Sequence, residues 1–302
     1  MTSPADDTTG ATASRPVPWT RRWRLPLLLV ATLIIMAVAQ QLTVALNDSG
    51  AVDLVAGVAL AAVTLFCYTR LSKLVERRQQ VTELPRDRAI SGLLGGSAIG
   101  AGAFLATMLV ILVFGGWHVT GGDSWKFLAT LGIMACVAVT EEVVFRGVLF
   151  RIAEERFGTW PALVVSAVLF GAVHLAGTSE TGTGAMLWGA TAIVLQGGIL
   201  LTAAYIATRA LWLPIGIHFA WNVVEAGFGT AVSGKSSEFG GLATTTLSGS
   251  PVLTGGSFGP EAGAAGILCC LVTSAFLLAF ARRTGRIRGR GERPGTGAAQ
   301  VG

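Results

Sequence analysis

Long apolar stretches alternate with short polar ones along most of this chain. A helix needs about 20 apolar residues to cross the hydrocarbon core of a bilayer. Eight stretches approach or exceed this length, near residues 25–46, 51–69, 90–114, 127–150, 161–176, 186–206, 211–230 and 263–281. The pattern therefore predicts an all-α fold, a polytopic membrane bundle of about eight transmembrane helices.

The composition agrees with a membrane protein. Hydrophobic residues make up 52% of the 302 residues and charged residues only 13%, with a mean hydropathy of +0.64. A soluble domain carries roughly 25% charged residues. The four cysteines all fall within predicted spans, so they predict small apolar core residues and no disulfide framework.

The positions of the basic residues predict an orientation. If the N-terminus is inside, all but three of the 22 Lys and Arg residues fall on cytoplasmic segments. The exceptions are Lys126 and Lys235, in outer loops, and Arg146, within a span. This asymmetry predicts an integral plasma (inner) membrane protein with both termini in the cytoplasm. The net charge of +5 then reflects topology and anionic headgroups, and predicts no nucleic-acid partner.

Composition also divides the chain into three parts. Residues 1–22, rich in Thr, Ser, Ala, Pro and Asp, predict a disordered cytoplasmic tail. Residues 23–283 form the membrane domain, which includes a flexible Gly/Ser/Thr-rich outer loop at 231–262, and residues 284–302 form a basic cytoplasmic tail. The first apolar stretch also has features of a cleavable signal peptide, but its apolar character continues to Leu46, which favours a span.

The third predicted span carries a ridge of glycines. Gly92, Gly96 and Gly100 are spaced four residues apart and so share one helix face. A ridge without side chains allows a second helix to approach closely. The simplest partner is another helix of the same chain, and a dimerisation seam is the alternative.

The fourth predicted span ends in charged residues. A charge at the centre of a span costs about 2.5 to 3.5 kcal/mol. Glu142 and Arg146 are four residues apart and can form an ion pair on one helix face. Glu141 lies about 100° round the helix from Glu142, so the same pair does not neutralise it. The stretch predicts a structural ion pair beside a free carboxylate, unless the three residues lie at the interface and extend into water.

Two of the three histidines also lie inside predicted spans. His174 follows Phe170 by one helical turn, and His218 precedes Asn222 by one turn. Intramembrane ionisable groups usually face the bundle interior and pair with one another. These residues and Glu141 therefore predict a shared polar site in the inner or middle part of the membrane, within a cavity open to the cytoplasm.

Three ordered motifs carry a family resemblance. Glu141-Glu142-x-x-x-Arg146, Phe170-x-x-x-His174 and His218-x-x-x-Asn222 resemble those of the CPBP family, the CAAX-protease and bacteriocin-processing (Abi) intramembrane proteases. The resemblance covers about residues 90–230 and implies an all-helical fold that hydrolyses peptide bonds in the inner leaflet. The membrane domain would then be an intramembrane protease domain with a family-like core at about 90–230.

The resemblance implies roles for the motif residues. Glu141 would be the general base that activates water, and His174 would position that water or share its proton. His218 and Asn222 would stabilise the oxyanion of the tetrahedral intermediate.

The resemblance also implies a role for Glu142 and Arg146, and it leaves open whether the reaction uses a metal ion. Glu142 and Arg146 would hold the helix and orient the site. Glu141, His174 and His218 could instead form a His₂Glu zinc set with an open position for water. A Zn²⁺-dependent and a metal-independent mechanism are both compatible with the sequence.

The predicted function is that of an intramembrane endopeptidase. Its partners would be the lipid bilayer and membrane-associated peptides or proteins, such as lipidated CAAX-like tails or bacteriocin-type precursors. A non-catalytic scaffold, or a peptide-binding immunity protein of the same fold, is the main alternative. A transporter would also bury carboxylates and histidines, but the chain shows no internal repeat.

Overall fold

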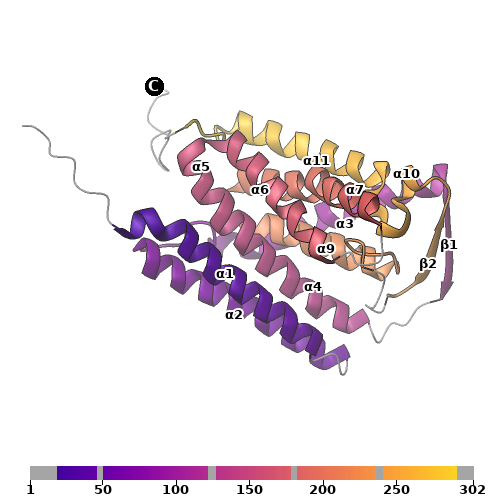
Figure 1. Ribbon diagram of the computed structural model, residues 1–302, viewed down its shortest axis with the longest axis horizontal. Helices are drawn as coiled ribbons and strands as arrows, with labels where there is room; N and C mark the ends of the chain where they lie inside the picture. Colours follow the sequence, from indigo (N-terminus) through magenta and orange to yellow (C-terminus); the bar gives the residue numbers. More distant parts are fainter. Residues whose placement is uncertain (1–18, 46–49, 122–126, 178–181, 236–240, 291–302) are drawn as a thin grey trace, which may run out of the picture.

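The computed structural model describes residues 19–45, 50–121, 127–177, 182–235 and 241–290. Within these ranges the chain forms a bundle of long helices (Figure 1), so the predicted helical membrane fold is confirmed. Most of the predicted N-terminal tail, the last twelve residues of the C-terminal tail and Lys126 lie outside the described residues.

Four of the predicted spans form single uninterrupted helices. They are α1 (Trp19–Ala45), α2 (Gly50–Glu76), α3 (Ala89–Phe114) and α11 (Ala264–Arg283). A helix satisfies all its backbone hydrogen bonds internally, which a chain in lipid requires. Helices α1 and α2 lie side by side along one edge of the bundle and α11 runs along the opposite edge (Figure 1).

Two further spans are continuous helical rods that contain π-helical turns. One rod consists of α4 (Phe127–Glu142), η2 (Val143–Phe150) and α5 (Arg151–Phe157). The other consists of α7 (Thr183–Ile193), η4 (Val194–Gly198) and α8 (Ile199–Thr208). π-Helical turns interrupt the i→i+4 ladder and often occur at functional sites. Here η2 carries Arg146, and η4 carries the two glycine carbonyls that Arg146 contacts.

The remaining predicted spans are shorter helices. They are α6 (Thr159–Val173) and α9 (Trp212–Gly227). Six of the described helical segments are long and apolar enough to cross a membrane, and α6 and α9 are not among them. At 1.5 Å per residue, α6 rises only about 22 Å, less than the roughly 30 Å hydrocarbon core. The number of spans therefore stays a prediction.

The segment between α9 and α11 contains local structure that the sequence did not predict. Strand β2 (Thr244–Ser248) pairs antiparallel with β1 (Gly116–Gly121). The short helix α10 (Pro251–Thr254) and the 3-10 turns η5 (Gly256–Phe258) and η6 (Pro260–Ala262) follow. This two-stranded sheet lies at the opposite end of the bundle from the first residues of α1 (Figure 1).

The glycine ridge of α3 packs against α9. A Cβ atom placed on Gly96 would lie 2.3 Å from the Leu213 carbonyl oxygen, and one on Gly100 would lie 2.3 Å from the Ile217 carbonyl oxygen. The close approach predicted for this face therefore occurs within the chain. Because Ile217 directly precedes His218, this contact fixes the depth at which α9 presents its histidine.

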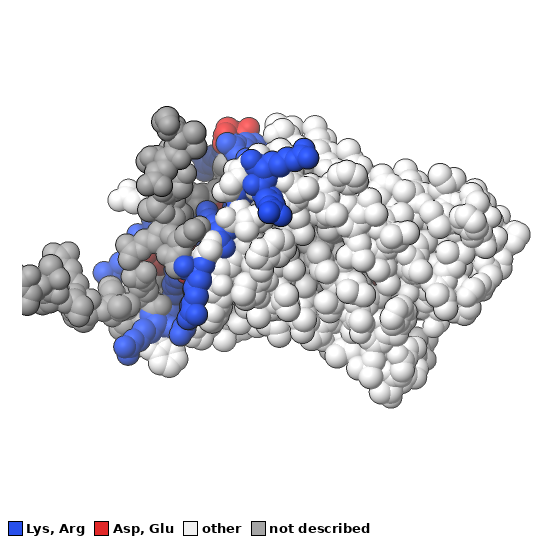
Figure 2. Space-filling model, turned by 90° about the horizontal axis from the view of Figure 1, so that it is seen from above, with Lys and Arg blue, Asp and Glu red and all other residues white. Residues whose placement is uncertain are grey.

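Basic side chains gather at one end of the bundle (Figure 2), which we call the basic end. There Arg24 of α1 forms ion pairs with Glu76 of α2, at 3.4 Å, and with Glu155 of α5. Arg151 binds Glu76 at 2.7 Å, and Arg209 is paired with Glu154. These pairs join the ends of several helices. The remaining described elements are the 3-10 turns η1 (Arg86–Arg88) and η3 (His174–Gly177). The orientation of this end towards the cytoplasm stays a prediction.

Candidate active site

The three sequence motifs meet in the middle of the bundle. The first lies on the α4–η2 rod, the second at the end of α6, and the third on α9. Helix α9 contacts both α3 and α4, and α6 contacts η2. These contacts bring together side chains that are far apart along the chain.

A buried ion pair forms the base of the site. The Arg146 guanidinium donates from Nη1 to Oε1 of Glu142 at 2.8 Å, and neither side chain is exposed. His218 Nδ1 lies 3.0 Å from the same carboxylate oxygen. With Glu142 charged, Nδ1 carries the hydrogen and donates it, which turns Nε2 of His218 towards Glu141. The pair expected from the i,i+4 spacing therefore exists and also orients the histidine.

Further contacts surround the Arg146 guanidinium on its other sides. Its Nη2 donates to the carbonyl oxygens of Gly197, at 3.3 Å, and Gly198, at 3.2 Å. Its Nε donates to Thr202 Oγ1 at 3.4 Å, and the Phe170 ring lies 4.5 Å from its Cζ. Such a planar, five-donor group can serve several acceptors at once, so these protein groups compensate its charge.

Glu141 has a different environment from its neighbour. Its side chain is 12% exposed and pairs with no arginine or lysine among the described residues. Oε1 accepts a hydrogen bond of 3.4 Å from Gln40 of α1, while Oε2 is buried and lacks a hydrogen-bond partner in the described structure. Nε2 of His218 lies 3.9 Å from Oε2. The sequence prediction of one ion-paired and one free carboxylate agrees with this geometry.

His174 lies where α6 gives way to a 3-10 turn. Its Nδ1 is 2.7 Å from the carbonyl oxygen of Phe170, so Nδ1 carries the hydrogen and Nε2 is left as an acceptor. The Phe170 ring lies 4.9 Å from the His174 ring and 6.0 Å from the His218 ring. Phe170 thus lies beside both histidine rings.

A cavity of about 400 Å³, which we call the Glu141 cavity, brings the predicted catalytic groups together. Glu141, His174, His218 and Asn222 all line it. Asn222 is 6% exposed, and no hydrogen bond of its side chain to another described residue is seen. A free amide beside a free carboxylate leaves both groups available to a bound molecule.

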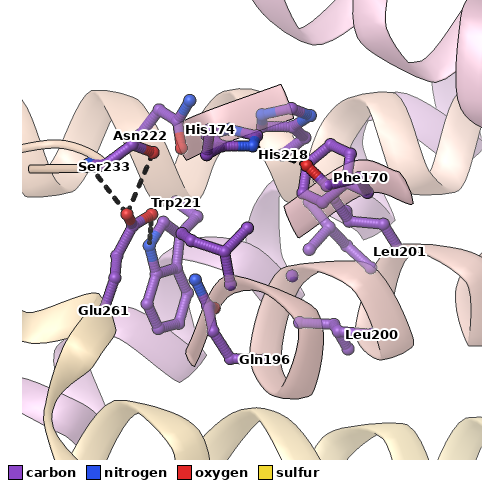
Figure 3. A pocket seen from close by; sticks show the side chains of 13 residues that line it. Phe170, His174, Gln196, Leu200, Leu201, His218, Trp221, Asn222, Ser233 and Glu261 are labelled. Atoms are coloured by element: carbon purple, nitrogen blue, oxygen red, sulfur yellow. Dashed lines mark hydrogen bonds between the residues drawn. The ribbon is translucent and has the colours of Figure 1, made fainter. Parts of the chain in front are cut away.

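A second, smaller hollow adjoins this cavity (Figure 3). Four residues line both spaces: His174, His218, Asn222 and Ser233. Trp221 and Glu261 line only the second one. Glu261 accepts hydrogen bonds from the Trp221 indole at 3.2 Å and from the Ser233 backbone at 2.8 Å. The Glu261 carboxylate thereby fixes the segment that follows α9 against the site.

Sequence reasoning missed two polar residues near the motifs. Gln40 contacts Glu141 but belongs to the first span, which the family resemblance does not cover. Glu261 belongs to a Gly-rich segment that showed no pattern. The polar Gln40-Gln41 pair in an otherwise apolar stretch was a usable signal, because buried polar groups need partners. For Glu261 the sequence offers no comparable signal.

The tentative zinc set does not fit this arrangement. Among the described residues, no three His, Cys, Asp or Glu side chains lie close enough together to hold a metal ion. We therefore derive no step through a metal.

Comparison with known proteins agrees with the motifs. Residues 123–224 match the family model described as Type II CAAX prenyl endopeptidase Rce1-like. The resemblance to the CPBP family is confirmed. The Rce1-like segment spans roughly a third of the chain and contains all six predicted catalytic residues, from Glu141 to Asn222. No curated protein and no solved structure gives a significant match.

The Rce1-like segment does not account for the whole site. Gln40 lies before it, and Ser233 and Glu261 lie after it. The first span and the segment after α9 therefore contribute walls that the family match leaves undescribed.

Proposed function

We propose that the protein is an intramembrane endopeptidase in which Glu141 is the general base. At the family level the Rce1-like match supports a CAAX-type intramembrane protease, and the helices support an integral membrane protein. The state of Glu141 is the observation that carries the proposal. It lines a cavity, has no cationic partner among the described arginines and lysines, and keeps one oxygen without a hydrogen bond. A base must be free to accept a proton.

In the proposed reaction, a water molecule lies between Glu141 and Nε2 of His174. Glu141 accepts one proton as the water oxygen attacks the scissile carbonyl carbon. The carbonyl oxygen becomes an oxyanion, which the Asn222 amide and His218 stabilise. A single well-placed donor of this kind is worth about 3 to 4 kcal/mol. Glu141 then returns the proton to the amide nitrogen, and the C–N bond breaks to give a carboxylic acid and an amine. The acid then passes its remaining proton to the amine, which leaves a carboxylate and an ammonium group.

Glu142 and Arg146 act as positioning residues. Glu142 holds His218 through Nδ1, and Arg146 holds Glu142 through a bond of 2.8 Å. Both are fully buried, so neither can contact a substrate directly. The chain of contacts sets the direction of the His218 ring, which is the group beside the reacting centre.

The proposed substrates are membrane-associated peptides or proteins, with lipidated CAAX-like tails and bacteriocin-type precursors as the starting candidates. The proposed location is the plasma (inner) membrane. These finer statements rest on the family resemblance, because a fold and its motifs do not by themselves identify a substrate.

The proposal can be tested by comparing peptide termini in host membranes. Membranes would carry the wild type, Glu141→Gln or Asp87→Asn at equal abundance. Asp87 is a suitable control because its carboxylate is 78% exposed and lies at the basic end. We expect a set of new termini with the wild type and Asp87→Asn that is absent with Glu141→Gln. Such termini would also identify the substrate.

The opposite outcome would favour the scaffold alternative. If wild type and Glu141→Gln give the same termini, and both elute as folded, monodisperse protein in detergent, Glu141 is not the base of a protease. Loss of termini with Asp87→Asn as well would show that the change at Glu141 acts through protein stability.

A further inference from the structure

The direction in which the Glu141 cavity opens can be derived from the lengths of the helices that line it. We infer that the cavity opens towards the membrane face opposite the basic end, so that its substrate is a peptide segment on the extracytoplasmic side. That this segment is cleaved rests on the proposed protease function. The direction in which the cavity opens does not.

Helix α1 gives the first measure of depth. Arg24 lies at the basic end, where it pairs with Glu76. Gln41 lines the Glu141 cavity and is exposed. The 17 positions between Arg24 and Gln41 correspond to about 26 Å of helix, compared with roughly 30 Å for the hydrocarbon core. The rim of the cavity therefore lies near the interface opposite the basic end.

The α4–α5 rod gives a second, independent measure. Arg151 binds Glu76 at the basic end, at 2.7 Å. Glu141 lies ten positions before Arg151, about 15 Å away along the rod. Val137 and Ile133, which also line the cavity, lie still further from the basic end, at about 21 and 27 Å. The cavity thus extends from Glu141 away from the basic end.

Helix α6 gives a third measure. Its first residue, Thr159, accepts a hydrogen bond of 2.9 Å from the Arg288 backbone at the basic end. His174 follows Thr159 by 15 positions, or about 22 Å. Val173, beside it, is exposed and lines the cavity.

The segment after α9 forms another part of the rim. Helix α9 begins at Trp212, whose indole donates to the Pro85 carbonyl oxygen near the basic end, and it ends at Gly227. Ser233 and the exposed Lys235 come after its far end, and both line the cavity. Four segments therefore place the rim at the same end of the bundle, the end that also carries the β1–β2 sheet (Figure 1).

Packed side chains close the site in the other direction. Glu142 and Arg146 are fully buried directly beneath Glu141. Below them Val148, Phe150 and Leu211 are 0% exposed. Two hollows at the basic end share no lining residue with the Glu141 cavity. Within the described structure, these side chains separate the free carboxylate from the basic end.

The distribution of basic residues indicates which side of the membrane the cavity faces. Nearly all Lys and Arg residues that the structure describes lie at the basic end, and segments rich in basic residues face the cytoplasm. The cavity would then receive peptide segments exposed at the outer face of the membrane. This inference replaces the cytoplasmic opening expected from the sequence.

Cysteine labelling on intact cells tests the inference without requiring cleavage. In a chain whose four native cysteines are replaced by alanine, we would introduce Lys235→Cys at the rim, Val137→Cys within the cavity, and Gln80→Cys at the basic end. Gln80 is an exposed residue between α2 and η1. A small, charged, membrane-impermeant thiol reagent should modify the first two cysteines in intact cells, and the third only after permeabilisation.

Two results would overturn the inference. Labelling of Gln80→Cys in intact cells, with Lys235→Cys protected until permeabilisation, would show that the basic end faces outwards. Labelling of Lys235→Cys but not Val137→Cys from outside, with Val137→Cys reached after permeabilisation, would show that the cavity opens to the cytoplasm. Gln41→Cys provides a second rim position if Lys235→Cys does not accumulate. Labelling remains informative even if Glu141→Gln leaves all peptide termini unchanged, so the two proposals can fail separately.

Discussion

Glu141 and Glu142 show how two identical, adjacent side chains acquire different roles. Consecutive residues on a helix point about 100° apart. Glu142 therefore faces Arg146 and His218 in the packed interior, whereas Glu141 faces the cavity and Gln40. One carboxylate is held in an ion pair and the other keeps a free oxygen.

This difference predicts different effects of the same substitution. Glu142→Gln leaves the fully buried Arg146 guanidinium without its counter-charge, and such a loss typically costs about 3 to 5 kcal/mol. Glu141→Gln removes no ion pair with a described arginine or lysine and should change stability much less. Thermal unfolding in detergent would measure both midpoints. Equal midpoints for Glu142→Gln and the wild type would show that the pair does not support the fold.

At the scale of elements, the contact between α3 and α9 determines the depth of His218. The two helices approach closely enough that backbone atoms of α9 occupy the space where side chains of α3 would lie. Glycine is required at these positions because any Cβ atom would push the helices apart.

A pair of glycine substitutions on α3 tests this contact. Gly100→Ala would place a Cβ atom 2.3 Å from the Ile217 carbonyl oxygen, whereas a Cβ atom at Gly102 meets nothing within 4 Å. We expect Gly100→Ala to lose about 1 to 3 kcal/mol of stability through overpacking and to lose activity because His218 shifts. Gly102→Ala should match the wild type in unfolding midpoint and in the production of new termini. A Gly100→Ala protein as stable and active as Gly102→Ala would contradict the assigned role of this contact.

At the scale of the whole molecule, a buried carboxylate helps to hold the basic end together. Glu83, between α2 and η1, is 1% exposed. It accepts hydrogen bonds from Arg78, at 2.7 Å, and from the Tyr68 hydroxyl, and its backbone carbonyl accepts from the Leu211 N–H at 2.8 Å. Burial raises the pKa of Glu83, but hydrogen bonding to Arg78 and the charges of Arg151 and Arg78 outweigh it, so the pKa is lowered.

This lowered pKa predicts an acid-sensitive basic end. A carboxylate with a folded-state pKa below its ordinary value of 4.5 contributes stability above that pH and loses it as the pH falls through the folded pKa. Glu83→Gln should therefore lower the unfolding midpoint at pH 7 and reduce the drop in midpoint between pH 7 and acid pH. Parallel slopes for the variant and the wild type across this range would contradict the prediction.

Several parts of this molecule were readable from the sequence because their determinants are local. Apolar runs predict helices wherever lipid forbids unpaired backbone groups. The Glu142–Arg146 pair follows from i,i+4 spacing, and the glycine ridge of α3 follows from the same periodicity. The β1–β2 sheet and the π-helical turns were missed, because pairing between distant strands and local changes in helix winding leave little trace in periodicity.

By itself, the sequence determined that this is a helical membrane protein with charged and polar groups placed within its spans, since hydropathy and motif spacing are properties of neighbouring residues. Only the tertiary structure decided which carboxylate is free, that Gln40 contacts it, and that Glu261 fixes the segment after α9 against the site. It also decided the direction of the cavity. A cavity is a space between α1, α4, α6 and α9, and its depth and opening depend on how these helices are displaced along one another, which no single segment specifies.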